Sequence, residues 1–365
     1  MPVCHAGTWN VEQNGSGDFT VIQDAVNAAA AGDTILIGPG WYQEATSVLI
    51  PLWPQPTDIF VNVTKENLTF IGSDVDEVII GPEESYLTFY GPQGFGGATL
   101  LEPFEIRNVT LRNVRDGVYM IGGGWVSGCK FISMVSHGVL SMEGAGANID
   151  SCYFEWAEAG VSFSLSTGGE VRDCIFYKSR ALVLDASDVL FENCRFEGGW
   201  PGIKFDGGQG TVNDCTLNGE GEIGAYGVIG INGAEVVVSE CEIIEYQFPL
   251  KSRNVSTVSA SECLLTVGAG AIVYVSTGAT ATIQGSDIYK TGDWYVQCAY
   301  YEGEPIALDL GGNYWGGASL EEVEAGILDS SVDPDVHYTV IVEPISDVPL
   351  PAEKKSMGGF KSLFR

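Results

Sequence analysis

The chain has 365 residues, of which 48 are acidic and 17 are basic, and its formal net charge is −31 at pH 7. A surface of this charge repels polyanions, so the composition argues against a nucleic-acid partner. The sequence contains no apolar run long enough to cross a membrane, and we expect no membrane-spanning helix. The acidity by itself indicates only a soluble, charged surface.

The N-terminal residues predict a leader remnant and then a capping helix. Residues 1–6 end at Ala6, and we interpret them as the end of a signal peptide, because a small residue precedes the cleavage site of such peptides. Thr20 and Gln23 predict a capping box, and Gly32 predicts the end of the helix. One apolar helix face contains Ile22, Ala25, Val26 and Ala29. We expect this helix to cover the open end of the fold that follows.

Seven cysteines, called the ladder cysteines below, recur at intervals of 20 to 26 residues: Cys129, Cys152, Cys174, Cys194, Cys215, Cys241 and Cys263. Each has an apolar residue three positions before it and another two positions after it, which is a strand pattern. Ser286 takes the cysteine place in an eighth copy. A period of this length marks a solenoid, in which each coil stacks on copies of itself.

The repeat unit is rich in Val, Ile, Phe and Gly and contains no helical stretch. It resembles the coils of right-handed β-helix proteins of the pectin-lyase-like superfamily, which carry an Asn/Asp/Glu-Cys-x-apolar signature. The resemblance implies an all-β fold, namely a single-stranded right-handed parallel β-helix with about 22 residues per coil and an N-terminal capping helix. We expect a cap and first coil at 7–47, the β-helix at 48–310, a closing segment at 311–346 and a flexible basic tail at 347–365.

The ladder cysteines could form disulfides, hold zinc or remain free thiols. Stacked coils give neighbouring cysteines parallel Cα–Cβ vectors, which is a poor geometry for a disulfide. The sequence has no Cys-x-x-Cys motif for zinc. We therefore expect buried free thiols that form a column in the core. Cys4 and Cys298 lie outside the ladder, and their state stays open.

Residues one coil apart should lie side by side on the outer face of a β-helix. On this basis, the candidate catalytic residues are Glu155, Glu158, Lys178, Arg180 and Glu197. Paired carboxylates serve glycoside hydrolysis, and a neighbouring Lys or Arg could act as the base of a lyase. The alternative, which we favour, is a solvated face of stacked opposite charges. His137 has no visible partner in the sequence and is interpreted as structural.

A second set of outward residues suggests sugar contact through exposed rings and neighbouring charges. The candidate carbohydrate-binding residues are Trp156, Trp200, Lys204, Asp206, Tyr246 and Trp294. Aromatic rings at such positions can stack on sugar faces. The alternative is that each ring packs against its own turn.

The active-site strings of polygalacturonases, pectin methylesterases, mannuronan epimerases and pectate lyases are absent from the sequence. Fold alone does not imply an activity. We therefore expect a secreted or cell-surface protein, extracellular or periplasmic, that binds a polysaccharide or cell-surface glycan as an adhesive or structural module. The alternative is a polysaccharide lyase or glycoside hydrolase. No motif predicts a metal site, and Ca²⁺ bridging carboxylates is the one cofactor that we consider.

Overall fold

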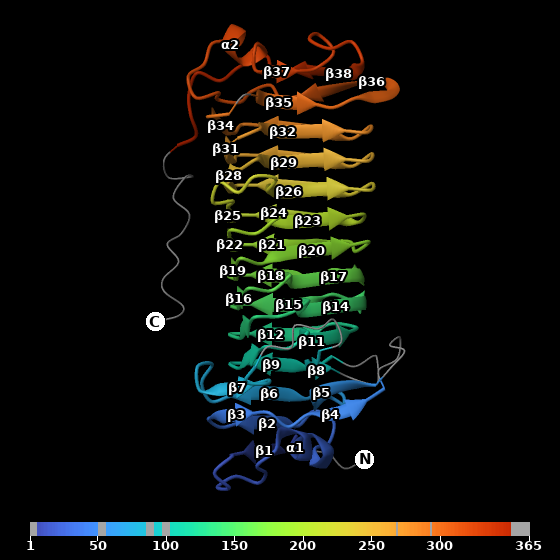
Figure 1. Ribbon diagram of the computed structural model, residues 1–365, viewed down its shortest axis with the longest axis vertical. Helices are drawn as coiled ribbons and strands as arrows, with labels where there is room; N and C mark the ends of the chain where they lie inside the picture. Colours follow the sequence, from blue (N-terminus) through green and yellow to red (C-terminus); the bar gives the residue numbers. More distant parts are fainter. Residues whose placement is uncertain are drawn as a thin grey trace. The chain divides into compact units, whose positions relative to one another are not determined.

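The computed structural model describes residues 6–49, 56–84, 91–96, 103–267, 269–292 and 294–351. It confirms the predicted fold, a right-handed parallel β-helix in which each coil passes through three parallel sheets. The chain divides into two compact units, Met1–Ser179 and Arg180–Arg365. Within each unit, the strands of one sheet lie one above another (Figure 1).

Unit 1 contains strands of all three sheets. The first sheet has β1 (Thr8–Val11), β2 (Thr34–Ile37), β6 (Thr69–Gly72), β9 (Glu105–Arg107), β12 (Gly124–Ser127), β15 (Ala147–Asp150) and β18 (Glu170–Arg172). The second has β3 (Gly40–Tyr42), β7 (Val78–Ile80), β10 (Thr110–Arg112), β13 (Lys130–Ile132), β16 (Tyr153–Glu155) and β19 (Ile175–Tyr177). The third has β4 (Thr46–Val48), β5 (Thr57–Asn62), β8 (Gln93–Gly96), β11 (Asp116–Ile121), β14 (His137–Ala145) and β17 (Ala159–Thr167). Strand β4 pairs with β5 in antiparallel fashion.

Unit 2 repeats this arrangement. Its first sheet has β21 (Val189–Glu192), β24 (Gln209–Asn213), β27 (Glu235–Ser239), β30 (Thr257–Ser261) and β33 (Thr280–Gln284). The second has β22 (Arg195–Glu197), β25 (Thr216–Asn218), β28 (Glu242–Tyr246), β31 (Leu264–Val267) and β34 (Asp287–Lys290). The third has β20 (Arg180–Leu184), β23 (Ile203–Asp206), β26 (Tyr226–Ile231), β29 (Phe248–Arg253), β32 (Ala271–Ser276), β35 (Trp294–Cys298) and β37 (Ile327–Leu328). Near the C-terminal end, β36 (Tyr301–Asp309) pairs with β38 (Val336–Ile341).

Helix α1 (Ile22–Ala28) covers the first coil of unit 1, as predicted. Its buried residues are Ile22, Ala25 and Val26, and it packs against β1, β2 and β5. The predicted capping box is wrong, because the helix begins after Val21 and no side chain caps it. The Gln23 side chain instead accepts a hydrogen bond from the backbone N–H of Asn62 at 2.8 Å. A capping box does occur at Ser319 and Glu322, where it opens α2 (Leu320–Glu324).

The ladder cysteines are buried free thiols that point into the core. In unit 1 the backbone N–H of Cys152 donates to the sulfur of Cys174 at 3.4 Å, and in unit 2 Cys194 does the same toward Cys215. Burial raises the pKa of the Cys215 thiol well above its ordinary value, so it is neutral. Cys298 is also a buried free thiol, and burial raises its pKa to about 12. These thiols act as small apolar groups.

Phenylalanines form a second column beside the cysteines. In unit 1, Phe131, Phe154 and Phe176 follow their cysteines by two positions and are paired in register on successive coils. Their ring centroids are 4.8 and 4.7 Å apart, with interplanar angles of 11° and 14°. That separation matches the spacing of parallel strands, so each ring fills one coil. The repeat therefore builds the core one layer at a time.

The residue before each ladder position turns the chain from the first sheet to the second. It has a left-handed backbone conformation in every copy, at Gly128, Ser151, Asp173, Asn193, Asp214, Glu240, Glu262 and Gly285. Gly, Asn and Asp tolerate this conformation well, whereas other L-residues pay a steric cost. The backbone N–H of Glu240 still donates to the carbonyl of Ser261 at 3.1 Å. Ser151, Glu240 and Glu262 are thus the strained members of the column.

We expect Glu240→Gly to raise the free energy of unfolding by about 1 kcal/mol, because glycine relieves the left-handed backbone. The change also removes the negative charge of Glu240. Burial is the largest cause of the raised pKa of Asp214, and the charge of Glu240 adds to it. The reciprocal variant Gly285→Ala should lower stability by a similar amount, since an added Cβ there meets nothing within 4 Å and the cost is conformational. Urea denaturation of both variants checks the pair. A less stable Glu240→Gly protein would contradict the explanation.

Several predictions fall outside the described residues. Residues 1–5 and 352–365, which include most of the predicted signal-peptide remnant and basic tail, belong to this group, as does Cys4. Within the described ranges, no helix is both long and apolar enough to cross a membrane.

Candidate functional site

The five candidate catalytic residues are divided between the two units. Glu155, Glu158 and Lys178 belong to unit 1, and Arg180 and Glu197 belong to unit 2. Glu158 is exposed and the others are half-buried. Glu197 forms an ion pair with Arg195 on its own strand, β22. That pair fits the interpretation of a solvated, charged face, and a catalytic role for the five stays a prediction.

Of the four candidate sugar-stacking rings, two are well exposed. Trp156 in unit 1 is 57% exposed and Trp200 in unit 2 is 59% exposed, whereas Trp294 at the start of β35 is half-buried. Tyr246 is fully buried, so its expected place on the surface is wrong. Strand pairing shifts register at this residue, and a Cβ on Gly219 would approach the Tyr246 ring to 2.8 Å. The neighbouring glycine thus leaves room for the ring to turn inward.

Trp200 lies in the turn between β22 and β23, and its indole is fixed although it is exposed. The indole N–H donates to the carbonyl of Gly224 in the loop before β26. The backbone N–H of Gly224 in turn donates to the Gln247 side chain at 2.6 Å. This loop belongs to the longest interval between ladder cysteines, and its Ile223 is 92% exposed. The loop therefore provides a raised, partly apolar edge next to Trp200.

Three further rings continue from Trp200 along the third sheet of unit 2. The ring centroids are 6.5 Å apart for Trp200 and Tyr226, 5.9 Å for Tyr226 and Phe248, and 5.2 Å for Phe248 and Tyr274. The strands that carry or follow these rings, β23, β26, β29 and β32, are neighbours in Figure 1. We call this row of rings, with Lys204 on β23 and Lys251 on β29, the Trp200 surface and define it as Trp200, Lys204, Tyr226, Phe248, Lys251 and Tyr274.

Lys251 is the unusual member of this patch, because it is only 6% exposed. Its Nζ lies 3.7 Å from the ring centroid of Tyr226, 4.8 Å from that of Tyr274 and 5.5 Å from that of Phe248. Ring faces attract cations, so this is a cation–π cage. Burial, and then the charge of Arg253, lower the pKa of Lys251 to about 8. The ammonium is therefore held in a site that is only partly compensated.

Lys204 and Asp206, both predicted as sugar contacts, form an ion pair on β23 with an N–O distance of 2.8 Å. Asn232 donates a second hydrogen bond to Asp206 at 2.6 Å. Burial raises the pKa of Asp206, but these two donors outweigh it and hold the pKa below its ordinary value. Lys204 is in register with Ile229, which is in register with Lys251. Trp200 lies in the turn before β23, which carries Lys204 and Asp206, and sugar contact by these three residues stays a prediction.

Unit 1 contains a buried charged cluster that the sequence analysis missed. Asp116 is 1% exposed and accepts a hydrogen bond from the Nε of Arg115 at 2.6 Å, and Arg115 is itself 2% exposed. The Nδ1 of His137 lies 2.7 Å from the other oxygen of Asp116. Asp116 and His137 are in register on β11 and β14, one coil apart. The spacing of 21 residues was therefore a usable signal for this pair.

The electrostatics of this cluster explain why a buried carboxylate is tolerated. Burial raises the pKa of Asp116, but hydrogen bonds from His137 and the charge of Arg115 outweigh it and hold the pKa below its ordinary value. The amide of Gln93 adds a long contact of 3.4 Å. Asp116 orients the imidazole, which is 23% exposed, through Nδ1. His137 is thus not the lone imidazole that the sequence suggested.

The family model described as "Right handed beta helix region" matches residues 96–226 of the chain. This match agrees with the three parallel sheets of the structure. The chain has a right-handed β-helix fold. No curated protein sequence matches it.

Several solved structures similar to this β-helix protein are enzymes of distant sequence. One is the catalytic unit of a thermostable GH87 α-1,3-glucanase from Streptomyces thermodiastaticus strain HF3-3, with a TM-score of 0.54 and 13% identity over 89% of this chain. Another is the catalytic domain of a GH87 α-1,3-glucanase in complex with nigerose, with a TM-score of 0.50 and 12% identity over 89% of this chain. The β-helix protein spans 64% and 67% of these two chains. A PL6 family polysaccharide lyase from Pseudopedobacter saltans has a TM-score of 0.46 and 12% identity, and the match covers 95% of this chain and 98% of the lyase chain. The likenesses to the two glucanases show the fold alone.

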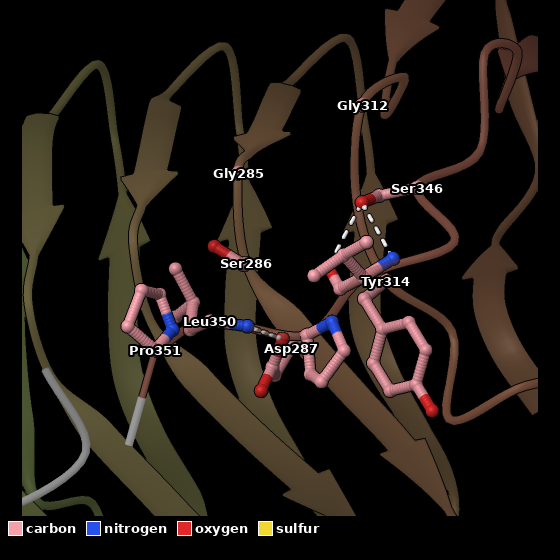
Figure 2. Close-up of a pocket in the computed structure, with 10 residues that line it drawn as sticks. Gly285, Ser286, Asp287, Gly312, Tyr314, Ser346, Leu350 and Pro351 are labelled. Carbon is pink, nitrogen blue, oxygen red and sulfur yellow. Dashed lines mark hydrogen bonds between the residues drawn. The ribbon is translucent and has the colours of Figure 1, made fainter. Parts of the chain in front are cut away.

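A cavity of about 190 Å³ lies near the C-terminal end of the β-helix protein, in unit 2. Figure 2 shows its lining, in which the backbone N–H of Leu350 donates to Asp287 at 2.8 Å. Ser346 likewise donates its backbone N–H to the carbonyl of Asn313 at 2.8 Å. The segment Ser346–Pro351 thus forms one wall, and the space is smaller than most ligand pockets. Among the described residues, no group of His, Cys, Asp and Glu is arranged to hold a metal ion.

Proposed function

We propose that this β-helix protein binds a polysaccharide or cell-surface glycan through the Trp200 surface, as an extracellular or cell-surface module. The observation that carries the proposal is the Trp200 indole, which is 59% exposed and yet fixed by its hydrogen bond to Gly224. A large ring held in place offers a flat apolar face to a sugar at little entropic cost. Tyr226 and the Lys204–Asp206 pair extend the patch with polar groups.

We expect Trp200→Ala to weaken glycan binding by about 30-fold, corresponding to roughly 2 kcal/mol for a central aromatic contact. Binding would be measured by affinity electrophoresis against a broad panel of neutral and acidic polysaccharides, followed by calorimetry on the best ligand. Trp156→Ala is the matched control, because Trp156 is equally exposed but belongs to unit 1. Circular dichroism would show that both variants fold.

The opposite pattern, in which Trp156→Ala abolishes binding and Trp200→Ala leaves it unchanged, would overturn the placement of the site. A wild-type protein that binds no member of the panel would argue against glycan binding as a whole.

A second candidate function is polysaccharide cleavage, and the Asp116–His137 pair favours it. An imidazole held at Nδ1 by a buried carboxylate can transfer a proton at Nε2. The two glucanases named above share the fold, which is compatible with this function at the level of fold. Release of reducing ends from the same panel, lost in His137→Gln, would establish cleavage. No release from any polysaccharide would leave binding as the function.

A further inference from the structure

The positive charge of Lys251 is only partly compensated by other groups of the folded chain. The residue is only 6% exposed, and the described part of the chain shows no ion pair between it and a carboxylate. Buried charges in proteins are normally paired, because removal from water is costly. The three rings around Lys251 supply only part of the compensation. The Lys251 ammonium therefore lacks an anionic partner among the described residues.

A second cation, Arg253, lies near Lys251 and further disfavours its positive charge. Arg253 follows Lys251 by two positions on β29, so both side chains leave the same face of the strand. Arg253 is exposed, and its charge opposes that of Lys251. No ion pair of Arg253 with an acidic side chain is found in the described part of the chain. Two adjacent cations without a carboxylate form a local positive site on a protein of net charge −31.

We infer that Lys251 and Arg253 form an anion-binding subsite of the Trp200 surface, and that the bound glycan carries an acidic group, a carboxylate or a sulfate, on some of its sugars. The inference rests on the proposed glycan-binding function and names its ligand class. The rings of Trp200 and Tyr226 take neutral sugar faces, and the two cations take the acidic group of a neighbouring sugar.

The overall charge restricts this ligand further. A glycan with an acidic group on every sugar would be repelled by a surface of charge −31, above all at low salt. A mostly neutral chain with sparse acidic sugars places one anion at Lys251 and few elsewhere. The ligand class is therefore a sparsely acidic glycan.

The test compares matched polymers that differ only in the acidic group. For the carboxylate, the probes are a xylan with sparse glucuronate branches and the same xylan after reduction of its carboxyl groups. For the sulfate, they are a sparsely sulfated galactan and its desulfated form. Fully charged polygalacturonate is a further probe. We expect the wild-type protein to bind at least one acidic polymer ten-fold or more tightly than its neutral partner, and more tightly than polygalacturonate.

Variants connect this preference to Lys251. Lys251→Met keeps an apolar side chain among the rings and should reduce the preference for the acidic polymer to about one, while binding to the neutral partner persists. Arg253→Gln should reduce it in part. Lys290→Met is the matched control, because Lys290 lies 4.8 Å from the ring centroid of Tyr295, away from the Trp200 surface. Trp200→Ala should weaken binding to both polymers alike. Thermal unfolding followed by circular dichroism would show that each variant folds.

Equal wild-type affinity for the acidic and neutral partners would overturn the inference, and so would a preference that survives in Lys251→Met. If the protein binds neutral glycans through Trp200 but none of the acidic ones, the proposed function stands and the subsite fails. If it binds no glycan of either kind, both fail.

Discussion

Replacing Asp116 by alanine is expected to lower the free energy of unfolding by about 3–5 kcal/mol, because the buried guanidinium of Arg115 then loses the carboxylate to which it is paired. Both residues are almost fully buried, so water cannot replace the missing charge. His137 also loses the acceptor that orients its ring. Urea denaturation followed by circular dichroism measures the loss. A cost below about 1 kcal/mol would contradict a tightly coupled buried pair.

Two further variants separate this effect from a general loss of charge. Glu170→Ala removes the partner of Arg172 in an exposed ion pair of the same unit, with an N–O distance of 3.0 Å, and should cost at most about 1 kcal/mol. The double variant Asp116→Ala with Arg115→Met should recover part of the loss, because no buried charge remains unpaired.

The same carboxylate predicts an acid-sensitive component of stability. The pKa of Asp116 in the folded protein lies below its ordinary value, so its contribution is complete above the unfolded pKa. The contribution is lost as the pH falls from that value through the lower folded pKa. Asp116→Ala should lack this component, and the stability difference from the wild type should therefore shrink at acid pH.

Replacing Cys194 by aspartate is expected to abolish cooperative folding. Cys194 is completely buried, and its sulfur lies 3.3 Å from the carbonyl of Glu192, which cannot stabilise a negative charge. A carboxylate at this position would be buried without a cation, at a cost of several kcal/mol. Soluble expression and a single cooperative thermal transition are the measurements. A stable, cooperatively folded Cys194→Asp protein would show that the ladder position tolerates charge.

Cys194→Ser is the matched control, and the chain itself shows why it should be tolerated. Ser286 occupies the equivalent position in the last copy and is 1% exposed. Its hydroxyl donates to the carbonyl of Gln284 at 3.2 Å and accepts from the backbone N–H of Cys263 at 3.1 Å. A serine at position 194 has the corresponding carbonyl of Glu192 available. Its cost should therefore be close to that of one hydrogen-bonded polar substitution, about 1 kcal/mol.

The sequence alone was sufficient for the fold and for much of the core. The interval of 20 to 26 residues between ladder cysteines is the length of one coil, and the strand pattern around each cysteine assigns it to the interior. Both features are local and repeat many times, so each copy supports the others. The capping helix followed from its own apolar face, although its capping residues did not.

The candidate site was only partly predictable. Trp200, Lys204 and Asp206 are predicted as site residues because they lie at outward positions near turns, which the repeat identifies. Tyr246 occupies a comparable place in the sequence and turns inward, because neighbouring glycines leave space for its ring. Asp116 lies one coil before His137, but its coil carries no ladder cysteine, so the repeat does not mark its position.

The sequence by itself therefore determined which residues stack on successive coils, because the repeat sets the register. Only the tertiary structure decided what the long side chains do once they are stacked. The Lys251 ammonium lies among rings from two neighbouring coils and its own, and Asp116 joins a residue of its own coil to one of the next. Such contacts depend on the rotamers and on the free space between coils, and a one-dimensional period contains neither.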